Sequence, residues 1–101
     1  MSDTQSRRTA IVTGASRGIG AAIAQRLARD GIAVIVNYAG DAQAAETVVS
    51  SIRTAGGQAE AVKADVSDPA AARHLFDAAE KAFGGVDVVV NNAAIIRLAT
   101  I

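Results

Sequence analysis

Residues 13–20 read TGASRGIG, a glycine-rich segment that joins an apolar run to a helical pattern. The preceding residues 9–13 predict a strand. The following residues predict an amphipathic helix, because apolar side chains recur at every fourth position, namely Ile19, Ile23 and Leu27. A strand, a tight turn and a helix in this order are typical of a nucleotide-binding βαβ unit.

Each glycine of this segment has a predicted role. Gly14 allows a sharp turn, Gly18 lets the backbone approach a pyrophosphate, and Gly20 lets the helix pack closely on the strand. The N–H groups at the helix start would then bind the anion. A purely steric turn is the alternative, but the position of the motif between a strand and an amphipathic helix favours nucleotide binding. A P-loop is excluded because its lysine is absent.

The alternation of apolar runs and helical patterns continues along the chain. Further strands are predicted at residues 33–36, 59–64 and 86–90. The run at 59–64 contains Glu60 and Lys63, so it is expected at an edge of the sheet.

Two further helices are predicted between these strands. Asp41 is expected to cap the first, whose buried stripe consists of Ala45, Val48, Val49 and Ile52. The second is expected to begin with Asp68 as its cap and Pro69 at its first position. Its predicted buried face consists of Ala72, Leu75, Phe76, Ala79 and Phe83.

The resulting order, β-α-β-α-β-α-β, predicts an α/β fold with a parallel sheet and crossover helices. Right-handed crossovers favour the strand order 3-2-1-4, which is the first half of a Rossmann-type doubly wound sheet. The first and fourth strands then lie side by side. Their carboxyl ends, at residues 13–14 and 91–92, flank the crevice where such sheets bind ligands.

Composition excludes several classes of function. Ten basic residues balance ten acidic ones, so no overall field favours nucleic acid or a membrane surface. The chain has no cysteine and a single histidine, His74, so neither disulfides nor a zinc cluster are expected. No apolar run approaches the length of a membrane-spanning helix, and a soluble, cytoplasmic protein is predicted.

Three motifs in this order resemble the short-chain dehydrogenase/reductase family. The first is Thr-Gly-x-x-x-Gly-x-Gly at residues 13–20, and the second is Asp65-Val66 after the third predicted strand. The third is the segment NNAA at residues 91–94, where the family usually has Asn-Asn-Ala-Gly. The resemblance implies an NAD(P)-binding Rossmann domain of which residues 1–101 are the N-terminal part.

The resemblance also implies roles for individual residues. Ser16, Arg17, Gly18 and Ile19 would cradle the pyrophosphate, with Gly14 and Gly20 shaping the loop. Asp65 and Val66 would border the adenine, and Asn92 and Ala93 would line the ribose of the adenosine. Asn91 would tie neighbouring strands together, and Ala94 adds a Cβ where the family has glycine.

The end of the second strand bears on the choice of cofactor. An acidic residue there would bind the ribose hydroxyls of NAD, whereas this chain has Asn37 and Tyr38. Arg17 could pair with a 2′-phosphate and the Asn37 amide could donate to it, so NADP is favoured over NAD. The alternative is that Arg17 is a solvated charge and Asn37 a turn former.

The implied function is NADP-dependent hydride transfer that reduces a carbonyl or oxidises an alcohol on a small molecule. The family's catalytic Tyr-x-x-x-Lys is not found, because Tyr38 is the only tyrosine and is followed four positions later by Ala42. The chain is therefore expected to stop before the catalytic half, and to be inactive alone. A non-catalytic NADP-binding module and an inactive fragment are the alternatives. A homodimer or homotetramer is expected of the intact protein.

Overall fold

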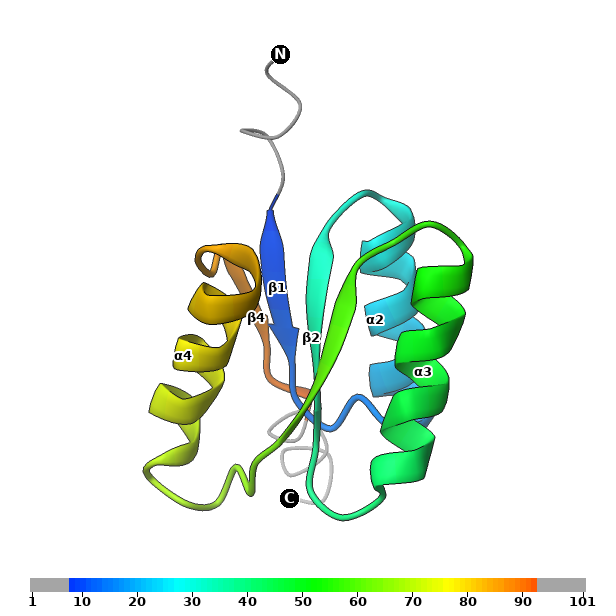
Figure 1. The fold of residues 1–101 in the computed structure, drawn as a ribbon. Coiled ribbons are helices and arrows are strands. Elements are labelled where there is room, and N and C mark those ends of the chain that lie inside the picture. Colours follow the sequence, from blue (N-terminus) through cyan, green and yellow to red (C-terminus); the bar gives the residue numbers. More distant parts are fainter. Residues whose placement is uncertain (1–7, 93–101) are drawn as a thin grey trace.

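A computed structural model describes residues 8–92, in which strands and helices alternate along the chain (Figure 1). The elements are β1 (Thr9–Val12), α2 (Gly18–Arg29), β2 (Ala33–Tyr38), α3 (Ala42–Thr54), β3 (Ala59–Lys63), α4 (Ala71–Phe83) and β4 (Val88–Val90). The strands form one parallel sheet in the order β3-β2-β1-β4. The predicted α/β class and the strand order 3-2-1-4 are therefore confirmed.

The helices cover both faces of the sheet, with α2 and α3 on one face and α4 on the other (Figure 1). Strands enclosed in this way are buried and mostly apolar, as residues 10–12 of β1 and the first four residues of β2 are. Ile11 and Ile35, paired across the sheet, face α4. Val12 and Val36, the next pair in the register, face α2 and α3.

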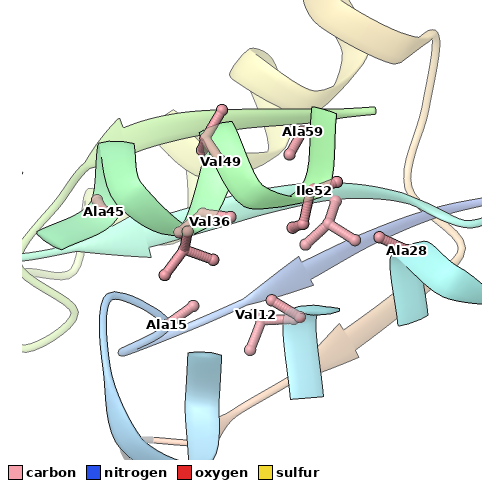
Figure 2. Close-up of a cluster of buried hydrophobic side chains, with 11 residues drawn as sticks. Val12, Ala15, Ala28, Val36, Ala45, Val49, Ile52 and Ala59 are labelled. Atoms are coloured by element: carbon pink, nitrogen blue, oxygen red, sulfur yellow. The ribbon is translucent and has the colours of Figure 1, made fainter. Parts of the chain in front are cut away.

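Small side chains let α2 lie close to the sheet. Gly20, Ala24 and Ala28, four positions apart, are its buried residues, and the two alanines pack into the core shown in Figure 2. The prediction from Ile19, Ile23 and Leu27 was wrong in part, because Ile19 is 70% exposed while the other two are half-buried. The larger side chains flank the contact stripe, since glycine and alanine give the shortest distance between helix and strand.

Helix α3 follows its predicted pattern. Ala45, Val48, Val49 and Ile52 are all buried against the sheet (Figure 2). The carboxylate of Asp41 accepts a hydrogen bond of 3.0 Å from the backbone N–H of Ala44, which confirms the predicted cap.

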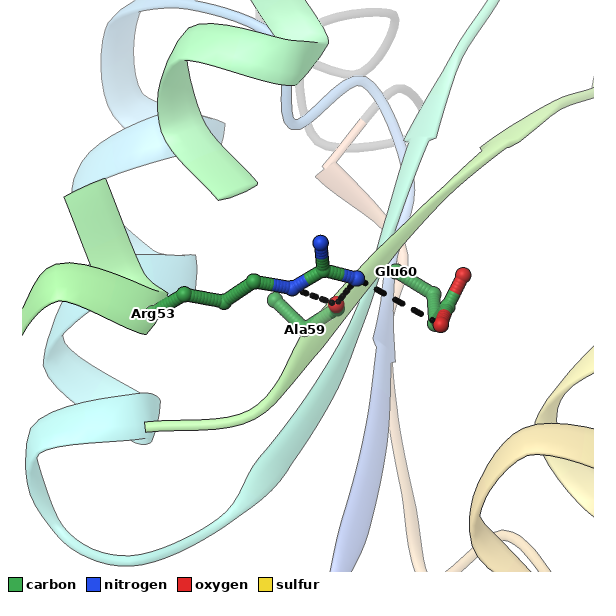
Figure 3. Close-up of polar contacts among 3 residues, drawn as sticks. All are labelled: Arg53, Ala59 and Glu60. Carbon is green, nitrogen blue, oxygen red and sulfur yellow. Dashed lines mark hydrogen bonds and ion pairs between the residues drawn. The ribbon is translucent and has the colours of Figure 1, made fainter. Parts of the chain in front are cut away.

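Arg53 attaches the end of α3 to the edge strand β3. Its guanidinium donates two hydrogen bonds, of 3.1 and 2.8 Å, to the carbonyl of Ala59, and it lies 3.4 Å from the Glu60 carboxylate (Figure 3). The position of β3 at the edge of the sheet confirms the prediction from its polar residues.

Helix α4 begins later than the Asp68-Pro69 pair predicted. Asp68 accepts a 2.9 Å hydrogen bond from the N–H of Ala70 and so closes a turn, and the helix starts at Ala71. Pro69 therefore belongs to this turn, not to the first helical position.

The buried face of α4 also differs from the predicted one. Its buried residues are Ala71, Leu75 and Ala79, whereas Phe76 is 44% exposed. Ala72 is exposed and Phe83 is half-buried. The contact of α4 with the sheet is a narrow stripe with a spacing of four residues, and Ala72 and Phe76 line a groove beside it.

A polar residue anchors the start of β4, which is shorter than the predicted run from 86 to 90. The Asp87 carboxylate accepts a 2.9 Å hydrogen bond from the Thr9 N–H, and the Asp87 N–H donates to the Thr9 carbonyl at 2.9 Å. Asp87 is thus the first link between the two strands whose carboxyl ends form the candidate site.

Two identical substitutions at different depths test this arrangement. We expect Val34→Ala, in the centre of the sheet, to lower the free energy of unfolding by about 2 to 3 kcal/mol because it leaves a cavity. Val89→Ala, at a position that is 50% exposed, should cost less than about 1 kcal/mol. Urea unfolding of both variants measures the difference, and equal losses would contradict the described packing.

Candidate functional site

The carboxyl ends of all the strands lie along one edge of the sheet, and the sequence motifs follow these ends. The glycine-rich segment 13–20 follows β1, Asp65 follows β3, and Asn91 follows β4. The strand order reverses between β1 and β4. From β1 the chain continues to β2 and β3 on one side, and it then returns to β4 on the other side of β1. Ligands of doubly wound sheets bind at this position.

The glycine-rich segment adopts a conformation that only glycine accommodates without strain. Gly14 has φ +60° and Gly18 has φ +63°, both in the left-handed region. A Cβ built on Gly18 would meet no atom of the described residues within 4 Å, so this position faces open space. The backbone is therefore accessible here to a ligand.

The first turn of α2 is arranged to receive an anion. Arg17 is its N-cap residue and makes no side-chain capping hydrogen bond, and the first turn contains no acidic side chain. The amides of Gly18 and the residues after it point toward the site with the positive end of the helix dipole. A phosphate group is stabilised in this environment.

Gly20 packs against the beginning of its own loop. A Cβ at this position would collide with the carbonyl oxygen of Gly14 and lie 2.9 Å from Nδ2 of Asn92. The predicted close packing at Gly20 is thus present. Gly20 packs against the Gly14 carbonyl in the loop and against the Asn92 side chain after β4.

Two buried asparagines hold the peptide groups of Gly14 from opposite sides. Oδ1 of Asn37 accepts a 3.1 Å hydrogen bond from the Gly14 N–H, and Nδ2 of Asn92 donates a 3.2 Å hydrogen bond to the Gly14 carbonyl. Asn37 is 2% exposed and Asn92 is 4% exposed. The loop is therefore fixed to both β2 and β4.

The amide of Asn37 has a different role from the one expected from the sequence. Nδ2 donates to the carbonyls of Val62 and Ala64 at 3.3 and 3.1 Å, and it lies 3.4 Å from the carbonyl of Tyr38. Its donors are directed into the protein, whereas the sequence suggested donation to a 2′-phosphate. Tyr38 itself is half-buried and packs against the core beneath α2 and α3.

Asn91 links the ends of β1 and β4, in agreement with its expected role. The Thr13 hydroxyl lies 3.3 Å from Oδ1 of Asn91 and 3.4 Å from the Val90 carbonyl, and the Thr13 N–H donates to that carbonyl at 3.0 Å. Ala93 and Ala94, also expected at the site, lie outside the described residues.

Asp65 presents a charged carboxylate at the end of β3. The hydroxyl and the N–H of Ser67 donate to its Oδ1 at 2.7 and 3.0 Å, and these bonds lower the pKa of the Asp65 carboxyl. Both Asp65 and Val66 are exposed, so either side chain can reach a ligand. Ser67 was missed in the sequence, although a serine two residues after an aspartate is a known signal for such a turn.

An apolar groove of about 240 Å³ opens beside the site, between α4 and β4. Its lining includes Ile11, Val66, Phe76 and Val89. A larger hollow of about 330 Å³ lies between the carboxyl ends of α2 and α3, around residues 55–57. It is at the opposite end of the strands from the glycine-rich segment and the other sequence motifs. The groove therefore borders the site and the larger hollow does not.

No helix within residues 8–92 combines the length and hydrophobicity needed to cross a membrane. No group of three or more histidine, cysteine, aspartate or glutamate side chains in the same range is positioned to hold a metal ion.

Comparison with known proteins agrees with this geometry. A family model described as short chain dehydrogenase matches residues 8–101. The chain belongs to the short chain dehydrogenase family. Members of this family are oxidoreductases. The sequence motifs that resemble this family follow the carboxyl ends of the strands.

Individual family members are similar over most of this chain. An uncharacterized oxidoreductase from Methylorubrum extorquens is 54% identical over 94 residues, which are 93% of this chain and 38% of that protein. The 3beta-hydroxysteroid dehydrogenase 1 of Eggerthella lenta is 48% identical over 95 residues, which are 94% of this chain and 36% of that protein. The chain thus spans little more than a third of the length of these relatives.

A solved structure has the same fold. The dehydrogenase/reductase from Sinorhizobium meliloti 1021 superposes with a TM-score of 0.81 at 49% identity, covering 84% of this chain and 34% of that one. The described elements therefore correspond to the N-terminal portion of a short chain dehydrogenase.

Gly20 provides a test of the packing within the site. Alanine in place of glycine normally stabilises a helix by about 1 kcal/mol. We expect Gly20→Ala to lower the free energy of unfolding by about 1 to 3 kcal/mol instead, because its Cβ collides with the Gly14 carbonyl. Gly40→Ala, where a Cβ meets no atom within 4 Å, is the control and should change stability by less than about 0.5 kcal/mol.

Proposed function

We propose that the protein containing this chain is an NADP-dependent oxidoreductase that reduces a carbonyl or oxidises an alcohol on a small molecule, and that this chain supplies cofactor binding. The observation that carries the proposal is the uncapped first turn of α2 beneath the open space at Gly18. When bound, the nicotinamide supplies or accepts the hydride, and the protein supplies orientation and proton transfer.

The phosphate end of the cofactor fits the glycine-rich segment. A Cβ at Gly18 would project into the space where a pyrophosphate approaches the amides, so the absence of a side chain there is required for contact. Ser16, half-buried in the same loop, and Ile19, exposed on the first turn of α2, would border the diphosphate. Arg17 is exposed at this end of α2.

The adenosine end fits the loops after β3 and β4. Asp65 carries acceptor oxygens, and an acceptor can take a hydrogen bond from the exocyclic amine of adenine. Val66 offers an exposed apolar surface beside it. Asn92 and Ala93 would border the ribose, with the Asn92 side chain already engaged by Gly14.

Charge favours NADP over NAD. The end of β2 has Asn37 and Tyr38 and therefore no carboxylate that would bind two ribose hydroxyls and repel a 2′-phosphate. With the Asn37 amide directed inward, the positive charge that would pair with this phosphate is that of Arg17.

Reversing the charge of Arg17 tests the choice of cofactor. We expect Arg17→Glu to weaken NADP binding by about tenfold or more while NAD binding changes much less, because it places a like charge near the 2′-phosphate. Fluorescence or calorimetric titration of the full-length protein with both cofactors measures this. Arg29→Glu, an exposed arginine at the other end of α2, is the control. Equal losses for both cofactors would refute the assignment.

A substitution at Gly18 tests the phosphate loop itself. Gly18→Val should abolish binding of both cofactors, because the side chain fills the approach to the amides and the residue has a positive φ. Gly31→Val is a matched control, since Gly31 also has a positive φ and open surroundings but lies at the far end of α2. Retained affinity in Gly18→Val, or an equal loss in Gly31→Val, would contradict the proposal.

A further inference from the structure

Asn37 is a polar residue at the end of an otherwise apolar and fully enclosed strand. The side chains of β2 alternate between the two faces of the sheet, and Asn37 follows Ile35 on the face toward α4. It is as deeply buried as the valines and isoleucine before it. A buried amide is costly unless its hydrogen bonds are made, so its partners indicate why it is there.

Its partners lie in the loop after β1, at the end of β3 and in the loop that follows β3. Oδ1 accepts from the N–H of Gly14, the first glycine of the phosphate loop, at 3.1 Å. Nδ2 donates at 3.1 Å to the carbonyl of Ala64, the residue directly before Asp65, and at 3.3 Å to that of Val62. One side chain therefore spans the distance between the loop that follows β1 and the loop that follows β3.

Backbone hydrogen bonds make the same connection less directly. The N–H of Ala15 donates to the carbonyl of Asn37 at 2.8 Å, and the N–H of Ala64 donates to that of Tyr38 at 3.0 Å. These bonds attach each loop to β2, whereas the Asn37 side chain joins the two loops to each other. Loss of the side chain would leave both loops attached to β2 but would remove the bonds that join them directly to each other.

The chemistry of this link is specific to asparagine. The link needs one acceptor and two donors at the end of a short side chain, and the amide of asparagine provides both. Aspartate would face the carbonyls of Val62 and Ala64 with a second acceptor. Threonine is close in volume and favours a strand, but its hydroxyl lies too near the backbone to reach both loops.

We infer that Asn37 is a positioning residue that sets the separation between the diphosphate site at the start of α2 and the adenine site at Asp65. The inference rests on the proposed dinucleotide binding. A dinucleotide occupies both sites at once, so its affinity depends on their separation, while a ligand that occupies one site does not sense it. Asn37 would thus affect binding without touching the cofactor.

The test compares a ligand that occupies both sites with a ligand that occupies one. NADP and adenosine are each titrated against the full-length protein and against its Asn37→Ala and Asn37→Thr variants. The Asn37→Thr variant is included in case Asn37→Ala does not fold. We expect the affinity for NADP to fall by about tenfold in either variant, and that for adenosine to change by less than about twofold. Ile35→Ala, buried on the same face of β2, is the control for general destabilisation.

Each remaining outcome is decisive. The positioning role is refuted if the NADP affinity of the Asn37 variants stays within about twofold of that of the original protein. It is also refuted if Ile35→Ala, at a thermal stability equal to that of the Asn37 variants, loses as much NADP affinity as they do. Equal losses for adenosine and NADP would also refute it, because they would show collapse of the adenine site alone. Failure of the unmodified protein to bind NADP would instead refute the proposed function.

Discussion

The hydrogen bonds on the two sides of Gly14 are the constraint on which the rest of the site depends. Asn37 on β2 accepts from its N–H, and Asn92, just after β4, donates to its carbonyl, so this glycine at the end of β1 is held from both neighbouring strands. A turn with a positive φ has few local interactions of its own, and buried amides supply them. The first turn of α2 is thereby presented with its amides unobstructed.

Close packing around this turn follows from the small size of its neighbours. Gly20 lies against the Gly14 carbonyl, and Ala24 and Ala28 continue the same stripe along α2. Because side chains are short there, the helix axis comes near to the sheet and its N-terminus stays at the strand ends. The packing of α2 on the sheet therefore also sets the position of its first turn, and a larger side chain in this stripe would shift the proposed phosphate site.

The charges at the site are divided between its ends. The positive end of α2 and the exposed Arg17 lie at the end proposed for phosphates. Asp65, whose pKa is lowered by hydrogen bonds from Ser67, lies at the end proposed for adenine. This division suits an elongated ligand with an anionic centre and a base that donates hydrogen bonds. Membership in the short chain dehydrogenase family is consistent with such a ligand.

The sequence by itself determined the order of elements, the sheet order, the Asp41 cap and the buried face of α3. These depend on turn chemistry, periodicity and the handedness of crossovers, which act over a few residues or one βαβ unit. Only the tertiary structure decided that Ile19 and Phe76 are exposed and that Asn37 faces inward. Gly14 and Ala64 lie 23 and 27 positions from Asn37, and Gly14 lies 78 positions from Asn92, so no local pattern records which of these distant atoms the side chains will meet.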